Sequence, residues 1–499
     1  MRNCAVSFVA LLVLWVVAGC TRAPHPAPLA SPTPITPTGT PRPTLVSAAS
    51  PSAPAPIPPT AAPTLEPPRF LRPQISLWSV LDVPNQTLTV TQRITYTNWT
   101  SATLTGIDLL LETNRYPGAF ALFGAENGGL QVSANPNVNR LSVKFAAPLP
   151  PGATTAVMLH YRVNLPPIPP PGGDKRPQPF GYTARQINLV DWYAMPVPYR
   201  AGEGWLIHEP WYYGEHQVYA AADVTARLHL NPPDAQMVIA AGAPAVTEGA
   251  WLRFERTGAR TLAFSLSPLY VPLTTTVGAT TVQAFVFPEH RTAGEEALRA
   301  TAAALALFNE TFGEYKQPVL SAVEADFWDG MEYSGLFFLS NRFYDLYDGT
   351  PKGYLTIIAA HETAHQWWFE RVGNDQGLEP WLDEGLCTFS ERLFYERVHP
   401  EAVNWWQVAR VNMYQPQGDA GLSLYQAGGF VPYRDAAYLR GAQFFIALRE
   451  AMGEDAFLAF LREYAARFDG EVARAADFWQ LLDETYPGDW ETLRAAYFR

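Results

Sequence analysis

The sequence predicts a multidomain α+β protein in which an antiparallel β domain precedes a mostly α-helical domain. Two observations support this division. Between residues 74 and 275, short runs of alternating apolar and polar residues recur between clusters of Pro, Gly and Asn, a pattern typical of half-buried strands joined by turns. Beyond residue 276, one strand-like run is followed by long segments rich in helix-forming residues.

The composition indicates a well-packed protein that does not bind nucleic acid. Hydrophobic residues make up 48% of the 499-residue chain and aromatic residues 13%, which supplies ample apolar surface for several domain cores. The formal net charge is -12, whereas binding to nucleic acid phosphates needs a surplus of Lys and Arg on one face. The sequence therefore excludes nucleic acid as an expected partner.

The first 20 residues predict an export signal. Arg2 precedes an apolar run, residues 5–18, that is too short to span a bilayer comfortably as a helix. The sequence VAGC at residues 17–20 resembles a bacterial lipobox, in which the cysteine becomes the lipidated first residue of the mature protein. We therefore expect residues 1–20 to be a lipoprotein signal peptide and Cys20 to be lipidated. The alternative is an ordinary cleaved signal with a chance cysteine.

A proline-rich segment follows at residues 21–73. Proline is interleaved there with Ala, Ser and Thr, and aromatic residues are almost absent, so no core can form and we expect a disordered, extended tether. Together with Cys20, this segment predicts an exported lipoprotein of the cell envelope. Its globular part would be held outside the cytoplasm, with the membrane as a partner through the lipid anchor.

Strand signals fill residues 74–275, which are therefore assigned to an antiparallel β domain. Alternation is clearest at residues 88–96, 157–163 and 224–230, where every second side chain can face a core. The intervening stretch at residues 166–181 is rich in proline and reads as a long loop.

Helix signals dominate residues 276–499, after a strand-like run at residues 282–287. Helices are predicted at residues 295–312, 354–371 and 381–398, because each segment ends near a glycine or before a proline.

The second of these helices carries the sequence HETAH at residues 361–365. Histidines at positions i and i+4 project from one helix face, so His361 and His365 can bind the same zinc ion. Glu362, one position after the first histidine, points toward a water molecule rather than the metal and is the predicted general base. Taken alone, the motif is also compatible with two ordinary core or surface histidines.

A third ligand is available in the next predicted helix. A catalytic zinc ion needs a third protein ligand and an open fourth position, and a carboxylate from a neighbouring helix is one common solution. Glu384 follows His365 by nineteen positions, far enough for a second helix to return antiparallel to the first. The predicted ligands of one zinc ion per chain are His361, His365 and Glu384. Cys387 is explained more simply as a small buried hydrophobic residue than as a ligand.

These motifs resemble the aminopeptidase N group of zinc metallopeptidases, the gluzincins that also include leukotriene hydrolase. The HExxH pattern, the glutamate after eighteen further residues and its W-L-x-E-G context are similar to those of the family, and DGMEY at residues 329–333 resembles its G-x-M-E-N segment. The resemblance implies a thermolysin-like catalytic domain, and it implies that Glu332 binds the free α-amino group of a peptide substrate. Asp329 and Tyr333 depart from the family pattern, at the first glycine and the asparagine.

A further segment, YLRGA at residues 438–442, is similar to the Y-x-K-G-A stretch of the family. The resemblance implies that Tyr438 stabilises the tetrahedral intermediate, and a phenol near zinc can donate a hydrogen bond to a developing oxyanion. Tyr433 is the nearby alternative. Asp383 stands where the family commonly has asparagine, and Glu391 is either a partner of a ligand imidazole or an exposed helix residue.

The resulting hypothesis is a zinc-dependent aminopeptidase that hydrolyses N-terminal residues from peptides, using a zinc-activated water molecule and a glutamate base. Few residues follow Tyr438 before Arg499, so we expect an open cleft that admits longer peptides. Three alternatives stay open. They are an endopeptidase or epoxide hydrolase on the same zinc scaffold, a non-catalytic peptide-binding surface lipoprotein, and a purely structural zinc site.

Overall fold

The computed structural model describes residues 72–170 and 178–499, which lie within one compact unit, Pro67–Arg499. The expected signal peptide, the lipidation site Cys20 and almost all of the expected tether lie outside the described residues. Within the described part of the chain, none of the helices combines the length and the apolar character that crossing a membrane requires.

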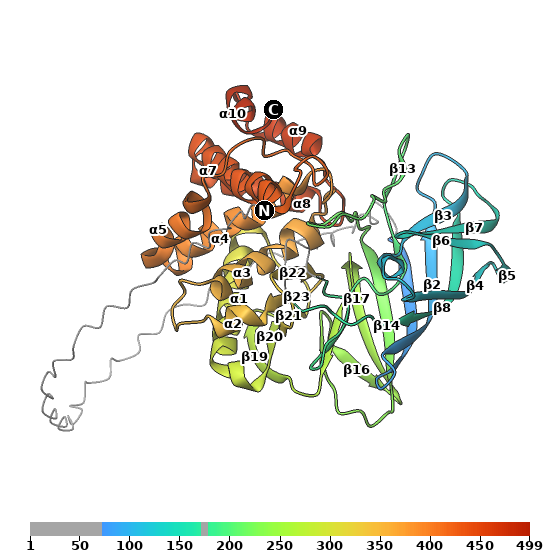
Figure 1. The fold of residues 1–499 in the computed structure, drawn as a ribbon. Helices are drawn as coiled ribbons and strands as arrows, with labels where there is room; N and C mark the ends of the chain where they lie inside the picture. The colour runs from blue at the N-terminus through green and yellow to red at the C-terminus, as the bar shows by residue number, and fades with distance from the viewer. Residues whose placement is uncertain (1–71, 171–177) are drawn as a thin grey trace, which may run out of the picture. The chain divides into compact units, whose positions relative to one another are not determined.

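An eight-stranded sheet is the largest sheet of the N-terminal part (Figure 1, blue to green). In spatial order its strands are β16 (Ala245–Glu248), β17 (Trp251–Ala259), β14 (Ala222–Asn231), β1 (Gln74–Asp82), β2 (Thr87–Thr97), β8 (Thr154–Asn164), β4 (Phe120–Asn127) and β5 (Leu130–Gln131). Every second side chain along β1 and β2 is buried, as the period-two pattern predicts. All neighbours pair antiparallel except β1 and β14, which run parallel. A parallel pair requires a long connection, and here the chain between β1 and β14 forms most strands of the other sheets in this half, except β15 and β18, which follow β14.

Three smaller sheets complete this part of the molecule. The first sheet has the order β11 (Met195–Pro196), β3 (Leu104–Leu110), β7 (Arg140–Leu149) and β6 (Ala134–Asn137). The second has the order β15 (Val238–Ala241), β18 (Phe264–Ser267), β10 (Ile187–Leu189) and β9 (Gly181–Tyr182). The third pairs β12 (Tyr199–Arg200) with β13 (Gly204–Trp205). The eight-stranded sheet and the two four-stranded sheets contribute to one continuous hydrophobic core. This N-terminal half, the β-rich part, therefore packs as a single body.

A five-stranded sheet begins the second half. Its spatial order is β19 (Val271–Val277), β20 (Thr280–Val286), β21 (Val319–Ala325), β23 (Leu336–Ser340) and β22 (Gly330–Tyr333). The central strand β21 is buried along its whole length, which is typical of a sheet covered on both faces. The short strand β22 lies at the edge and pairs antiparallel with β23, so its residues are available to a neighbouring site.

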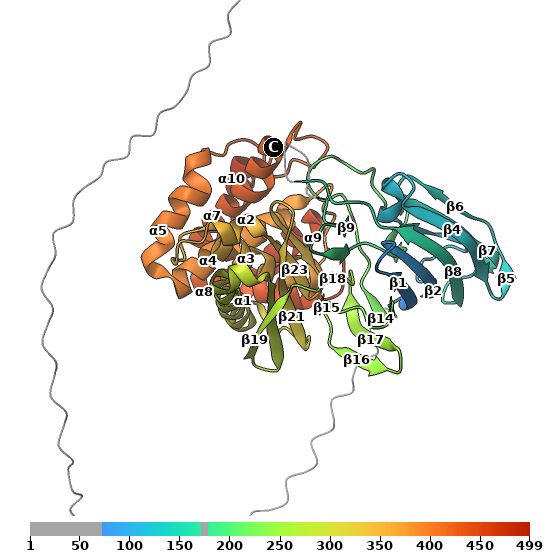
Figure 2. The ribbon, with the colours of Figure 1, turned by 60° about the horizontal axis from the view of Figure 1, so that its bottom comes forward.

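Helices cover this sheet and form the C-terminal part (Figures 1 and 2). They are α1 (Arg291–Phe312), α2 (Asn341–Asp345), α3 (Tyr354–Ala364), α4 (Glu384–Val398), α5 (Val403–Trp406), α6 (Phe430–Arg434), α7 (Gly441–Met452), α8 (Glu454–Arg467), α9 (Ala475–Thr485) and α10 (Glu491–Tyr497). Helix α1 packs on β19 and β20, and α3 packs on α1, on α4 and on β23. The predicted fold class, a β domain followed by a mostly α-helical domain, is confirmed.

The helix predicted at residues 354–371 is divided in the structure. The α-helical part, α3, ends at Ala364, and a π-helical turn continues from Gln366 to Arg371 with Trp368 at non-helical angles of φ -99° and ψ 33°. Two adjacent tryptophans of this turn, Trp367 and Trp368, are buried. A π-helical turn accommodates one extra residue per turn, which sequence periodicity does not reveal.

A buried ion pair connects the β-rich part to this π-helical turn. Arg256 of β17 donates from Nε to Glu370 Oε1 at 2.8 Å and from Nη2 to Glu370 Oε2 at 2.7 Å. Arg260 follows on the same segment and donates to the carbonyl oxygens of Glu370 and Tyr219, at 3.0 Å and 2.8 Å. The two halves of the chain are therefore held together at the segment that directly follows α3.

Replacing Arg256 with Met should strongly destabilise the protein, because it leaves the Glu370 carboxylate buried without its cation. Breaking a buried pair in this way costs about 3–5 kcal/mol, which urea unfolding would measure as a lower free energy of unfolding. Arg253→Met, on the same strand but in a partly exposed pair with Glu248, is the control and should cost about 1 kcal/mol or less. Equal losses in the two variants would contradict this role for Arg256.

Candidate metal centre

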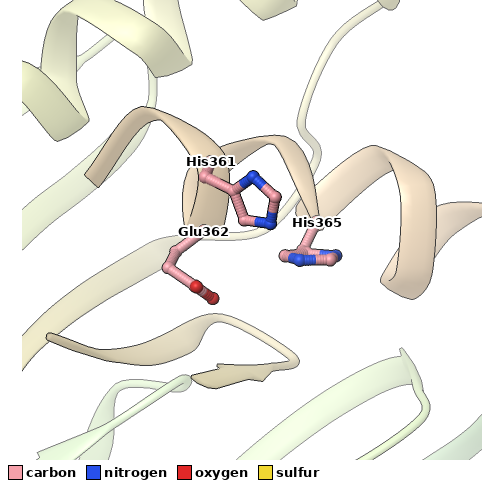
Figure 3. A group of neighbouring side chains, drawn as sticks. All are labelled: His361, Glu362 and His365. Atoms are coloured by element: carbon pink, nitrogen blue, oxygen red, sulfur yellow. The ribbon is translucent and has the colours of Figure 1, made fainter. Parts of the chain in front are cut away.

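Helix α3 and the residue that directly follows it carry three polar side chains, His361, Glu362 and His365, on one side (Figure 3). The imidazole rings of His361 and His365 have their centroids 4.9 Å apart, and Glu362 projects beside them. All three side chains are buried. Buried polar groups are costly unless they have partners, so the surroundings of this helix face decide what the three residues can do.

Glu384 brings a carboxylate to both histidines. It is the first residue of α4, which packs against α3. Its Oε2 atom lies 3.1 Å from His361 Nε2 and 3.7 Å from His365 Nε2. Two imidazole nitrogens and one carboxylate oxygen therefore converge on one place, as the sequence predicts for a set of zinc ligands.

The opposite nitrogens of the two imidazoles face other carboxylates. His361 Nδ1 lies 2.7 Å from Glu391 Oε1, and His365 Nδ1 lies 2.7 Å from Asp383 Oδ1. A hydrogen on each Nδ1 satisfies these contacts and leaves the lone pair of each Nε2 free for a metal ion. Glu391 is fully buried, so it is a partner of the ligand imidazole and not an exposed helix residue.

Possible ligand atoms also lie within 4.8 Å of one another in two other groups, which are His361 with Glu362 and His365, and His365 with Asp383 and Cys387. Cys387 Sγ lies 3.3 Å from His365 Nδ1, on the side that the Asp383 carboxylate already occupies. Burial raises the pKa of the Cys387 thiol well above its ordinary value, and the nearby carboxylates add to the rise. A thiol that stays protonated is a poor metal ligand, so the Nε2 side is the better candidate.

Glu362 is buried, and its Oε2 atom has no hydrogen-bond partner among the described residues. Burial raises its pKa well above the ordinary value, and the charges of Glu332 and Glu384 raise it further. A β-carbon on Gly330 would lie 2.1 Å from Glu362 Oε1, so the absence of a side chain at residue 330 provides the space for this carboxylate. A buried acid with a free oxygen is suited to receive a proton from a small ligand.

Glu332 reaches the same region from the edge strand β22. Its Oε1 atom accepts a hydrogen bond from Gln376 Nε2 at 2.9 Å. Burial raises the pKa of Glu332, the charge of His365 opposes the rise, and the charge of Glu215 adds to it. Asp329, at the place of the family's first glycine, has a φ of 75°, so it retains a conformation that glycine adopts more readily.

Tyr438 lies in another π-helical turn, Asp435–Arg440. Its ring stacks on the His361 imidazole with centroids 5.9 Å apart and an interplanar angle of 8°. Burial raises the pKa of Glu384, and a hydrogen bond from Tyr438 acts in the opposite direction. The ring of the alternative, Tyr433, packs against the Tyr438 ring, with centroids 5.9 Å apart. Of the two tyrosines, Tyr438 is the one that stacks on the predicted ligand His361.

Three residues of the site were not identified from the sequence. Glu215 precedes β14 in the β-rich part, and its charge raises the pKa values of Glu362 and Glu384 in addition to burial. Arg410 donates to both oxygens of Glu391, at 2.8–3.2 Å. Gln376 contacts Glu332. All three lie outside the motifs, so no spacing rule connects them to the histidines.

The structure thus brings together every predicted site residue that it describes. The group consists of His361, Glu362, His365, Glu384, Glu332 and Tyr438. Cys20 lies outside the described residues.

Comparison with known proteins identifies similar chains for this region. Residues 296–494 match the model of the peptidase family M1 domain. Aminopeptidase M1-B of Oryza sativa subsp. japonica is 28% identical over 206 residues, which cover 38% of this chain and 24% of the rice protein. Glutamyl aminopeptidase of Sus scrofa is 26% identical over 216 residues, 40% of this chain and 23% of the pig protein. The chain therefore matches about a quarter of the length of these relatives.

The fold is similar to that of solved structures over most of the chain. The M1 zinc metallopeptidase of Deinococcus radiodurans superimposes with a TM-score of 0.61 at 19% identity, and the match covers 86% of this chain and 94% of that chain. A variant of that enzyme crystallised with a Tyr-Ser-Ala substrate matches with a TM-score of 0.60 and the same identity, over 86% of this chain and 93% of that chain. These matches confirm the two-part fold.

Proposed function

We propose that this chain is a zinc-dependent aminopeptidase that releases N-terminal residues from peptides, because residues 296–494 match the model of the peptidase family M1 domain. One observation carries the proposal. Two histidine Nε2 atoms and the Glu384 carboxylate converge beside Glu362, whose Oε2 atom has no hydrogen-bond partner in the described residues. A structural zinc site is normally closed by four protein ligands, whereas three ligand side chains converge here. The aminopeptidases and the peptide-bound metallopeptidase among the similar proteins support the same activity.

The donor set fits zinc. Neutral imidazole nitrogens and a carboxylate oxygen are common zinc ligands, and the hydrogen bonds at each Nδ1 leave Nε2 of His361 and His365 available. These two residues and Glu384 would hold the ion. When bound, zinc would supply Lewis-acid polarisation of the scissile carbonyl and would lower the pKa of a water molecule.

Glu362 moves the proton. Its carboxylate removes a proton from the attacking water molecule and returns it to the departing amine. Burial raises the pKa of Glu362, which makes its carboxylate a stronger base than an exposed glutamate. The side chain needs no rearrangement to accept the proton, because its Oε2 atom is not engaged by another described residue.

Tyr438 stabilises the oxyanion. Its ring stacks on the His361 imidazole, so the phenol lies beside the predicted ligands. A hydrogen bond donated in the transition state lowers the barrier by about 3 kcal/mol in comparable sites. The ring position beside His361 favours Tyr438 over Tyr433 in this role.

Glu332 binds the substrate's terminal ammonium group and thereby selects which peptide bond reaches Glu362. Its carboxyl is buried within the same cluster, where a cation is attracted more strongly than in water. The negative charge of Glu215 acts on the same place. Both carboxylates favour a positively charged chain end over the neutral interior of a peptide.

Glu362→Gln should retain stoichiometric zinc and lose at least about 100-fold in kcat, because general base catalysis contributes about 10²–10⁴. Zinc content by elemental analysis and turnover of aminoacyl anilides would be measured on the same preparation. Glu295→Gln, an exposed glutamate on α1, is the matched control and should keep both values. A Glu362→Gln variant with normal turnover would refute the role of Glu362 as the general base.

Acetylating the substrate's α-amine should lower kcat/KM at least about 30-fold, because losing one partner of a buried charge pair costs about 2–5 kcal/mol. A free aminoacyl anilide and its N-acetyl form would be compared at equal concentrations. Equal rates would favour an endopeptidase on the same scaffold. Hydrolysis of an epoxide without hydrolysis of either anilide would favour an epoxide hydrolase.

We also propose that the chain is an exported lipoprotein of the cell envelope, tethered to the membrane through Cys20. The support is the sequence alone: a short apolar run, a lipobox-like VAGC and a proline-rich spacer before the folded part. This arrangement would place the peptidase part outside the cytoplasm, where it would meet exogenous peptides.

Cys20→Ala should abolish incorporation of a labelled fatty acid and release the protein from the membrane fraction. In-gel detection of the label and fractionation of expressing cells would measure both effects. Cys387→Ala is the control and should keep the label, because Cys387 is buried within the peptidase part. Label retained by Cys20→Ala would contradict the anchor.

A further inference from the structure

We propose that Gln376 is a positioning residue that couples the carboxylate binding the substrate amine to the carboxylate that orients a zinc ligand. Its side-chain nitrogen Nε2 donates to Glu332 Oε1 and to Asp383 Oδ2, at 2.9 Å in both cases. The inference rests on the proposed function, since it takes Glu332 as the amine site and His365 as a ligand.

The geometry forms one continuous chain of contacts. Asp383 uses Oδ2 to accept from Gln376 and Oδ1 to contact His365 Nδ1 at 2.7 Å. The whole chain is buried, with exposed fractions of 5% for Glu332, 3% for Gln376 and 1% for Asp383 and His365. Water therefore does not compete for these hydrogen bonds, and a displacement of one member is transmitted to the next.

An amide is the group that this position requires. Two buried carboxylates repel each other, and an ionised carboxylate has acceptors only. The NH₂ group of Gln376 carries two hydrogens, one for each carboxylate, and it adds no charge. A lysine at this position would also satisfy both acceptors, but its positive charge would compete with the substrate ammonium for Glu332.

The family resemblance indicates why residue 376 has to donate a hydrogen bond to Asp383. Asp383 stands where the family commonly has asparagine, whose own amide can donate a hydrogen bond. An aspartate at this position keeps the acceptor toward His365 and loses that donor. In this chain, Gln376 supplies the hydrogens that the aspartate lacks, so Asp383 and Gln376 act as one unit.

Removing the two hydrogens should therefore affect two processes together. Without Gln376, repulsion between Glu332 and Asp383 is no longer offset, so Glu332 loses its fixed orientation toward a substrate amine. Asp383 is released at the same time, and the His365 imidazole is oriented less strictly. Substrate binding and zinc binding should both weaken, whereas the proton transfer at Glu362 is less affected.

Gln376→Met tests this in the full-length protein, because methionine has a similar length and shape but no hydrogen-bond donor. We expect KM for leucine p-nitroanilide to rise about tenfold with kcat within threefold, and the zinc dissociation constant to rise about tenfold, near the lower limit for partners of metal ligands. Zinc affinity would be measured by competition with a chromophoric chelator, which does not depend on activity.

Gln92→Met is the matched control. Gln92 is another buried amide, in β2, where it donates to the Ala194 carbonyl oxygen at 2.6 Å and accepts from the Tyr161 hydroxyl at 2.8 Å. Its replacement should lower thermal stability and leave KM and zinc affinity within twofold. Gln376→Met with wild-type KM or wild-type zinc affinity overturns the proposal, because the coupling requires both to change.

Two further measurements apply if Gln376→Met does not fold or if the unmodified chain does not hydrolyse anilides. If Gln376→Met does not fold, Gln376→Asn retains the amide on a side chain too short to reach both carboxylates; it must raise KM and the zinc dissociation constant at least threefold, and unchanged values overturn the proposal. If the unmodified chain hydrolyses no anilide, the proposed activity fails. Calorimetric binding of leucine amide, with N-acetyl-leucine amide as its control, then replaces KM as the readout for Gln376.

Discussion

A group of buried carboxylic acids surrounds His361 and His365, and the organisation of the site depends on how their charges are balanced. The acids whose pKa burial raises well above its ordinary value are Glu332, Glu362, Asp383 and Glu384. Buried carboxylates in mutual contact ionise together only where cations or hydrogen-bond donors offset their repulsion. The imidazoles and the Gln376 amide supply donors on one side, and a divalent cation at the Nε2 side would supply the remaining charge.

The fold brings these acids together from separate elements. Helix α3 supplies His361 and Glu362, and His365 directly follows it. The start of α4 supplies Glu384, and the edge strand β22 supplies Glu332. A π-helical turn follows His365 directly and another one carries Tyr438; such turns are frequent at functional sites because they redirect side chains within a helix. The Arg256–Glu370 pair fixes the first of these turns to the β-rich part, so the helical site is supported by the other half of the chain.

Sequence patterns predicted the elements whose signal is local. The alternating residues of β2, β8 and β14 and the Gly313 that ends α1 lie where periodicity and helix-end rules place them. The parallel pairing of β1 with β14 and the division of residues 354–371 at Ala364 were not predicted. Strand pairing between distant segments depends on the path of the whole chain, and a π-helical turn depends on how its side chains pack, so neither has a local signal.

For the site, the sequence by itself determined which side chains could act as metal ligands and that two of them share a helix face, because the spacing of HETAH fixes the direction of His361 and His365. The resemblance added Glu332 and Tyr438. Only the tertiary structure decided which imidazole nitrogen faces Glu384, that Glu391 and Asp383 occupy the other nitrogens, and that Gln376 connects Asp383 to Glu332. The physical reason is that hydrogen bonds between residues far apart in sequence depend on the packing of α3, α4 and β22, which no local spacing determines.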